Sequence, residues 1–312
     1  MRRLNAPGRG FDMKTILDRI VDRRREDVAA RKQVIRLPEV MTDAGYAAAL
    51  ADRPGGGLRP LFGGARSGKK NFTDVPGHKW PEAVHQKKQQ NGIIIAECKK
   101  ASPSRGLMLP EYDPVALARR YEAGGASAVS VLTEPDFFSG CDEDLRKVRE
   151  ATGLPVLRKD FIVDEWQIDE SFVLGADIVL LIASVLGVSE LDGMIERAHR
   201  LGMEVLLEAR DATELEKIRL SGLEPDALGV NSRDLRDFSV DPERLVTLTG
   251  SMLSGPAWVA ESGIHATETV RALSRAGFDA FLIGEHFALA VDPEAEVRRF
   301  RGTLDEEKSD GK

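Results

Sequence analysis

From about residue 92 onward, short apolar segments rich in Val, Ile, Leu and Ala alternate with longer amphipathic segments. Apolarity within each short segment is continuous, which is typical of parallel strands buried on both faces. Eight such segments occur: 92–100, 126–134, 154–160, 176–182, 203–209, 227–232, 257–263 and 280–286. Their number predicts a sheet of eight parallel strands.

The amphipathic segments carry Leu, Val and Ala at helical spacing, and each ends in Gly, the residue favoured just past a helix C-terminus. They cover 113–125, 143–153, 188–202, 212–222 and 266–277. Strands that alternate with helices at intervals of roughly 20–30 residues indicate a (β/α)8 TIM barrel, an α/β fold. An open doubly wound sheet is the competing architecture, but no GxGxxG turn follows the first strand segment.

The first 91 residues precede this pattern. Residues 13–32 are predicted to form a helix with Ile16, Leu17, Ile20, Val21 and Val28 on one face. Residues 54–91 are dense in Gly, Pro and Lys, and we expect a mobile surface loop there.

We therefore expect one barrel domain over residues 1–312. An N-terminal helix and an insertion occupy 13–91, and eight βα units occupy 92–302. The polar tail from residue 305 is expected to fray.

Composition narrows the function classes. Charged residues make up 30% of the chain, and the net charge of −7 is spread along it, so we expect no nucleic-acid or membrane surface. The two cysteines are too few for a disulfide framework. No signal peptide or apolar membrane span is recognisable. We expect a cytoplasmic protein, a monomer or weak homo-oligomer, that acts on a small molecule.

Two apparent motifs are set aside. Residues 63–70 nearly match a P-loop, but no strand precedes them and Lys70 replaces the Ser or Thr that binds magnesium. A flexible basic loop is the better interpretation. The five histidines lack metal-ligand spacing, so we expect neither a metal nor another cofactor.

Polar side chains gather where the predicted strands end, which is where barrel enzymes build their active sites. They include Glu97, Lys99, Glu134, Lys159, Glu208, Asn231, Arg233, Glu261 and Ser262. Any one of them could simply solvate a strand end, but this explanation is harder to sustain for seven of eight strands. Neighbouring lysines and glutamates would couple their titrations, and we expect this to tune a lysine toward neutral pH as a general acid.

Glycines follow the last two predicted strands. Gly263 and Gly284 stand where backbone N–H groups can approach an anion closely. In barrels this is the common position of a phosphate site. The substrate is therefore expected to carry a phosphate group.

Several segments together resemble the indole-3-glycerol-phosphate synthase family of tryptophan biosynthesis. The most specific are IAECKKASPSRG (95–106), PVLRKDFIVDEWQI (155–168), VLLEARDATEL (205–215), LGVNSRDL (228–235), AESGI (260–264) and LIGEHF (282–287). The resemblance extends from residue 13 to about 300. It implies a carbon–carbon lyase (a carboxy-lyase) that closes the ring of 1-(2-carboxyphenylamino)-1-deoxyribulose 5-phosphate with loss of carbon dioxide and water.

The resemblance also implies catalytic roles. Lys159 matches the general acid that protonates the ribulose carbonyl, and Lys99 matches the lysine that holds the anthranilate carboxylate. Glu208 matches the residue that assists dehydration, and Glu97 and Asn231 match residues that position the lysines and the substrate hydroxyls.

The remaining matches concern binding. The expected substrate-binding residues are Ser102, Phe138, Phe161, Arg233, Glu261 and Ser262. The expected phosphate-binding residues are Ser102, Gly263, Gly284 and Glu285. The two phenylalanines fit aromatic walls around the anthranilate ring and core packing equally well.

Three alternatives remain open. Phosphoribosylanthranilate isomerase is another phosphate-binding barrel, but it works with a cysteine and an aspartate. A Schiff-base aldolase would use one lysine, usually from a later strand. A catalytically silent scaffold barrel is disfavoured by the presence of Lys99, Lys159 and Glu208. The long segment 54–91 departs from the family pattern, which puts its contribution to substrate binding in doubt.

Overall fold

Eight parallel strands close into a barrel in the order β1-β10-β9-β8-β7-β6-β5-β4. The computed structural model describes residues 14–37, 42–62, 92–234, 239 and 243–310. The strands are β1 (Ile93–Cys98), β4 (Ala128–Leu132), β5 (Val156–Lys159), β6 (Ile178–Ile182), β7 (Glu204–Ala209), β8 (Ala227–Asn231), β9 (Ala257–Glu261) and β10 (Ala280–Ile283). Each lies inside one predicted segment, so the TIM-barrel prediction is confirmed.

Both faces of every strand are buried, which explains the continuous apolarity. Inside the barrel, Ile95, Leu157 and Leu206 belong to one apolar cluster. On the outside, alternate residues such as Ile94 and Leu207 pack in a second cluster that includes the surrounding helices. Successive residues of a strand thus serve two cores, because side chains alternate across a sheet.

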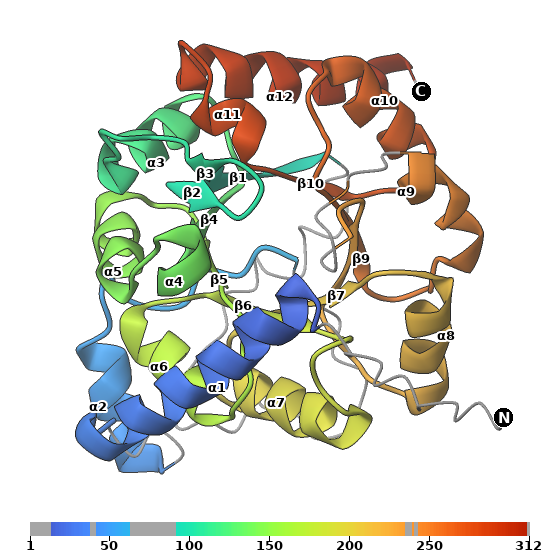
Figure 1. Ribbon diagram of the computed structural model, residues 1–312. Coiled ribbons are helices and arrows are strands. Elements are labelled where there is room, and N and C mark those ends of the chain that lie inside the picture. The colour runs from blue at the N-terminus through green and yellow to red at the C-terminus, as the bar shows by residue number, and fades with distance from the viewer. Residues whose placement is uncertain (1–13, 38–41, 63–91, 235–238, 240–242, 311–312) are drawn as a thin grey trace, which may run out of the picture.

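A ring of helices surrounds the barrel (Figure 1). Its main members are α3 (Pro114–Ala123), α5 (Asp142–Ala151), α6 (Trp166–Leu174), α7 (Val188–Arg200), α8 (Ala212–Ser221), α10 (Thr267–Arg275) and α12 (Pro293–Asp310). Shorter elements are α4 (Pro135–Phe138), α9 (Glu243–Thr247), the 3₁₀ turn η3 (Thr249–Ser251) and α11 (Glu285–Ala288). The five predicted helices correspond to α3, α5, α7, α8 and α10.

The tail expected to fray from residue 305 instead continues α12 to Asp310. Asp305 pairs with Arg301 at 3.1 Å, and Glu306 pairs with Arg271 of α10 at 3.3 Å. These contacts favour the helical conformation of the tail, so the prediction is wrong for residues 305–310. Residues 311 and 312 lie outside the described part of the chain.

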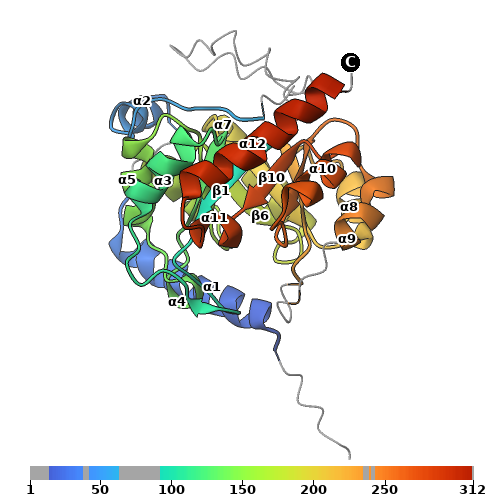
Figure 2. The same cartoon turned by 90° about the horizontal axis from the view of Figure 1, so that it is seen from above.

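The predicted N-terminal helix is α1 (Ile16–Val34). Thr15 and Asp18 form a capping box, in which each side chain accepts a hydrogen bond from the other residue's backbone N–H. Leu17, Ile20 and Val28 are buried, as predicted. The two views show α1 crossing the end of the barrel at which α4 lies (Figures 1 and 2).

A segment after α2 (Asp43–Ala51) reaches the opposite end of the barrel. Leu61 and Phe62 are buried, and their backbone N–H groups donate to the Glu204 carboxylate at the start of β7, at 2.7 and 3.0 Å. The prediction of a mobile surface loop over 54–91 is therefore wrong for 54–62. Residues 63–91, with the P-loop-like segment, lie outside the described residues.

In the described part of the chain, no helix combines the length and apolarity that a membrane span requires.

Candidate active site

A pocket opens at the ends of the strands where the polar residues were predicted to gather. It encloses about 880 Å³, counting the space at its open mouth. All eight strands of the barrel contribute residues to its walls. They include Glu97, Lys99, Ser102, Phe138, Lys159, Phe161, Glu208, Asn231, Arg233, Glu261, Ser262, Gly263, Gly284 and Glu285, which are all of the predicted site residues. The structure thus brings together every residue with a predicted catalytic or binding role. Glu134, which was also expected at this end of the barrel, is not among the walls, and its carboxylate instead caps α4.

Each lysine of the pocket lies against a carboxylate. Lys99 Nζ is 2.8 Å from Glu97 Oε1. Lys159 Nζ is 3.0 Å from Glu261 Oε2 and 3.4 Å from Glu208 Oε2. Both ammonium groups are therefore fixed by ion pairs before any substrate is bound.

The strand period explains why Glu97 and Lys99 meet. They are two positions apart and therefore face the same way. Cys98 between them is fully buried and points toward the helices, with Sγ 3.7 Å from the carbonyl oxygen of Pro114. Burial raises the pKa of the Cys98 thiol, which keeps it neutral.

Asn231 links two parts of the pocket. Its Nδ2 donates to Glu208 Oε1 at 3.1 Å, and its Oδ1 accepts from the backbone N–H of Arg233 at 2.9 Å. Both oxygens of Glu208 are therefore engaged, one by Asn231 and one by Lys159. This arrangement fixes the orientation of the carboxylate.

Charges around Lys159 determine its protonation. Burial by itself lowers the pKa of Lys159, but the carboxylates of Glu261, Glu208 and Glu97 outweigh it and raise the pKa well above its ordinary value. The expectation of a lysine tuned toward neutral pH is therefore wrong for Lys159. Three carboxylates keep Lys159 a cation at neutral pH.

Glu261 is the least satisfied group of the pocket. Burial raises its pKa to about 8, against the opposing effect of Lys159. Its Oε1 is buried and has no hydrogen-bond partner among the described residues. A Cβ at Gly229 in β8 would lie 2.1 Å from this oxygen, so glycine at 229 leaves the space that Glu261 occupies.

The turns predicted to hold the phosphate follow β9 and β10. Ser262 and Gly263 both have positive φ angles, 64° and 69°, and for serine this conformation is strained. A Cβ at Gly284 would lie 2.2 Å from Glu97 Oε1. Glycine there lets the backbone approach the catalytic side chains closely. Ser102 is buried and its Oγ accepts from the Arg105 N–H at 3.3 Å.

Phe138 and Phe161 form an aromatic pair on the wall of the pocket. Their ring centroids are 6.1 Å apart, with an interplanar angle of 36°. Phe161 is buried among the apolar residues of the barrel interior, and Phe138 packs partly buried against them. The two proposed roles, pocket wall and core packing, are therefore combined.

Several pocket contacts were missed by sequence reasoning. Arg105 pairs with Glu285 at 2.6 Å, and Arg233 Nη1 donates to Ser104 Oγ at 3.3 Å. Both contacts come from the hairpin of β2 (Ala101–Ser102) and β3 (Gly106–Leu107), which follows β1. Its SPSRG sequence, rich in turn-forming residues directly after a strand, was the available signal.

The described residues contain no group of three or more His, Cys, Asp or Glu side chains that could hold a metal ion.

Known proteins resemble this chain in sequence. A family model described as indole-3-glycerol phosphate synthase matches residues 67–300. The indole-3-glycerol phosphate synthase of Neisseria meningitidis serogroup B is 40% identical over 286 residues, which cover 91% of this chain and 98% of that protein. The enzyme of the same name from Campylobacter curvus is 46% identical over 208 residues, 67% of this chain and 79% of that protein.

Solved structures share the fold at much lower identity. A 3-hexulose-6-phosphate synthase from Salmonella typhimurium gives a TM-score of 0.56 at 16% identity, covering 69% of this chain and 99% of that one. Orotidine 5'-phosphate decarboxylase from Pyrococcus horikoshii gives 0.52 at 15% identity, covering 68% and 99%. At these identities the likeness concerns the barrel alone. The sequence matches go further: this chain belongs to the indole-3-glycerol phosphate synthase family, a family of carboxy-lyases in tryptophan biosynthesis.

Proposed function

We propose that the pocket closes the indole ring of 1-(2-carboxyphenylamino)-1-deoxyribulose 5-phosphate, with Lys159, Lys99 and Glu208 as the acid–base residues. The observation that carries this proposal is the ion-paired arrangement of both lysines within one pocket. The phosphate of the substrate would lie beside Gly263 and Gly284, which line the same pocket.

The first step joins two carbons. The aryl carbon that bears the carboxylate attacks the ribulose carbonyl carbon, and the carbonyl oxygen must take up a proton as its double bond opens. We assign that proton to Lys159, because three carboxylates raise its pKa and keep it protonated. Glu261 and Glu208 hold Nζ within 3.4 Å, which limits the directions in which it can donate.

The second step releases carbon dioxide. The bond between the ring and the carboxylate breaks, and its electron pair restores the aromatic ring. We assign Lys99 to hold this carboxylate, and Glu97 to position Lys99 through their 2.8 Å contact. Phe138 and Phe161 are proposed to flank the anthranilate ring, which suits their tilted pair on the wall.

The third step removes water. The new hydroxyl leaves with a proton while the adjacent carbon loses one. We assign Glu208 to accept the carbon-bound proton, and Asn231 to orient Glu208 through its 3.1 Å hydrogen bond. Lys99 is proposed to protonate the leaving hydroxyl. Transfer of the accepted proton from Glu208 to Lys99, and uptake of one proton from solvent by Lys159, restore all three groups and balance the overall reaction.

The remaining residues are assigned to binding. Ser102, Gly263, Gly284 and Glu285 are proposed to hold the phosphate, the last three through backbone N–H groups. Arg233, Glu261 and Ser262 are proposed to contact the rest of the substrate. A phosphate beside Glu285 would compete with its carboxylate for Arg105, now 2.6 Å away.

The test is the appearance of indole-glycerol phosphate fluorescence when the purified chain is mixed with the substrate. Lys159→Met, Lys99→Met and Glu208→Gln are each expected to lower kcat strongly. Lys147→Met is the matched control, since Lys147 is an exposed lysine on α5. Absence of fluorescence at micromolar enzyme, or unchanged turnover of Lys159→Met, would contradict the assignment.

We further propose that the chain acts as one domain, as a cytoplasmic monomer or weak homo-oligomer. Light scattering during size-exclusion chromatography tests the oligomeric state, and a tight oligomer at micromolar concentration would contradict it.

A further inference from the structure

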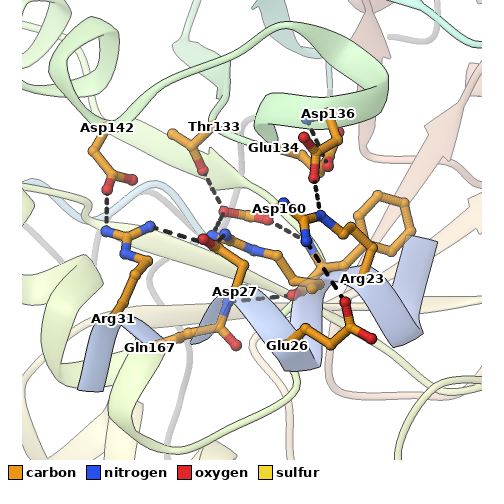
Figure 3. A network of polar contacts seen from close by, with 12 residues as sticks. Arg23, Glu26, Asp27, Arg31, Thr133, Glu134, Asp136, Asp142, Asp160 and Gln167 are labelled. Carbon is orange, nitrogen blue, oxygen red and sulfur yellow. Dashed lines mark hydrogen bonds and ion pairs between the residues drawn. The ribbon is translucent and has the colours of Figure 1, made fainter. Parts of the chain in front are cut away.

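A buried ionic network connects α1 with the ends of β4 and β5. Arg24 of α1 is only 2% exposed, Asp160 after β5 is 1% exposed, and Arg158 of β5 is fully buried. Arg24 Nη2 donates to Asp160 Oδ2 at 2.7 Å across 136 positions of sequence. Figure 3 shows Asp160 at the centre of the network, between Thr133 and the side chains of α1.

Asp160 accepts hydrogen bonds from three elements. Its Oδ2 accepts from Arg24 at 2.7 Å, from Thr133 Oγ1 at 2.6 Å and from Arg158 Nη2 at 3.2 Å. Its Oδ1 accepts from the backbone N–H of Phe161 at 2.8 Å. The carboxylate therefore fixes the backbone just after β5 relative to both α1 and β4.

Both Asp160 and Arg24 are charged. Burial raises the pKa of Asp160, but the guanidinium groups of Arg24 and Arg158 outweigh it and lower the pKa below its ordinary value. Arg158 is shared with Asp142 and Glu170, at 3.1 and 2.9 Å. Removing Arg24 would leave Asp160, within the part of the chain that the structure describes, with this shared cation alone.

The neighbours of Asp160 in sequence belong to the active site. Lys159 and Phe161 both line the pocket. A small displacement of Asp160 therefore moves the proposed acid and one aromatic wall together. A misplacement of about 1 Å in an active site can lower the rate about 100-fold.

Stability alone does not explain this ion pair. Replacing a buried pair by apolar residues is often neutral or stabilising, because burial of two charges costs desolvation energy. The Nε of Arg24 is also buried without a hydrogen-bond partner among the described residues. A defined position for the end of β5 is a benefit that an apolar contact would not supply.

We propose that Arg24 is a positioning residue for the reaction: through Asp160 it holds the end of β5, and with it Lys159 and Phe161, in register with the pocket. This inference rests on the proposed role of Lys159. It assigns to α1, which lies outside the eight βα units, a part in setting the turnover rate.

The experiment compares two arginines of α1. Arg24→Met removes the cation that contacts Asp160. Arg31→Met is the matched control, because Arg31 pairs with Asp142 and Glu170 in the same network and, within the described residues, forms no ion pair with Asp160. Arg24→Lys keeps the charge. For each variant kcat, KM and Tm are measured.

Arg24→Met is expected to lower kcat by about 10- to 100-fold, with a smaller change in KM. Arg24→Lys should recover most of the rate, and Arg31→Met should lower Tm with little change in kcat. In a Lys159→Met background, Arg24→Met should cost far less than in the wild type, since the group that it positions is gone.

Equal kcat losses for Arg24→Met and Arg31→Met, or additive losses in the double variant, would overturn the inference. If Arg24→Met does not fold, Arg24→Gln takes its place in the same comparison. Unchanged turnover of Lys159→Met alone would contradict the proposed function instead, so the two failures are distinguishable.

Discussion

Buried charged side chains are hydrogen-bonded to different extents at the two ends of the barrel. At the end where the strands begin, Asp177 pairs with Arg149 at 2.9 Å and Arg53 at 3.1 Å, and all three side chains are at most 1% exposed. Asp177 also accepts from the backbone N–H groups of Val156 and Arg59, both at 2.9 Å. Each oxygen of this carboxylate is satisfied, and protein atoms fill the surroundings.

At the opposite end, the buried polar groups are satisfied less completely. Two lysines face three carboxylates, those of Glu97, Glu208 and Glu261. The lysine side chains are 14–15% exposed to the pocket. One oxygen of Glu261 has no partner in the described part of the chain, and Ser262 beside it has a strained backbone. The comparison indicates that ion networks with all hydrogen bonds formed stabilise the fold. Polar groups that lack part of their hydrogen bonds are the ones that can bind and react with a substrate.

The largest effect of a substitution is expected at the end of the barrel that holds the pocket. Lys159→Met should lower kcat by about 100- to 10,000-fold, the range for loss of a general acid. Its Tm should change little, because Glu261 can take up a proton once the cation is gone. Product fluorescence and thermal unfolding measure the two quantities. A large loss of Tm with a small loss of kcat would show that Lys159 stabilises the fold more than it contributes to catalysis.

At the end of the barrel where the strands begin, Arg149→Met should destabilise the fold by about 3–5 kcal/mol, because it leaves Asp177 buried with one cation fewer. The kcat per folded molecule should remain that of the wild type, since Arg149 is remote from the pocket walls. Denaturant unfolding and active-site-normalised turnover check this. A loss of kcat without destabilisation would show that the Asp177 network also contributes to catalysis.

Gly229→Ala is expected to lower both the stability of the fold and kcat. The added Cβ would approach Glu261 Oε1 to 2.1 Å, so Glu261 must move away from Lys159. We expect about 1–3 kcal/mol of destabilisation from overpacking, together with a lower kcat. Adding Glu261→Gln does not remove the clash and should not restore the rate. Wild-type stability and rate would show that Glu261 has room to move.

The effect of pH is gradual, and per pH unit it is the smallest of the four. The pKa of Glu261 is raised by burial from 4.5 to about 8, so the folded state binds a proton more tightly than the unfolded state between these values. Stability should therefore fall as pH rises from about 4.5 to 8, by at most about 1.4 kcal/mol per pH unit from this group. Glu261→Gln should flatten this slope in unfolding experiments between pH 5 and 8. An unchanged slope would assign the pH dependence to other groups.

Local patterns were sufficient for much of the fold. Continuous apolar segments predicted the eight strands, because each strand residue is buried on one face or the other. The two-residue period of a strand accounts for the contact between Glu97 and Lys99 and for the outward direction of Cys98. The end of each strand predicted which polar side chains share a pocket, since parallel strands of a barrel all end on one side. These features depend on neighbours within a few positions.

Only the tertiary structure decided which distant groups meet. Lys159 and Glu261 are 102 positions apart, and Glu261 reaches Lys159 because Gly229 on a third strand leaves space. The residues that join α1 to Asp160, and Leu61 to Glu204, likewise lie more than 100 positions apart. The pKa of Lys159 was mispredicted for the same reason, because it depends on burial and on carboxylates from three other strands. Sequence alone thus determined the barrel and which residues line its pocket. The packing of segments remote in sequence determined the protonation of Lys159, the ion-pair partners of each charged side chain and the contacts at the end of the barrel where the strands begin.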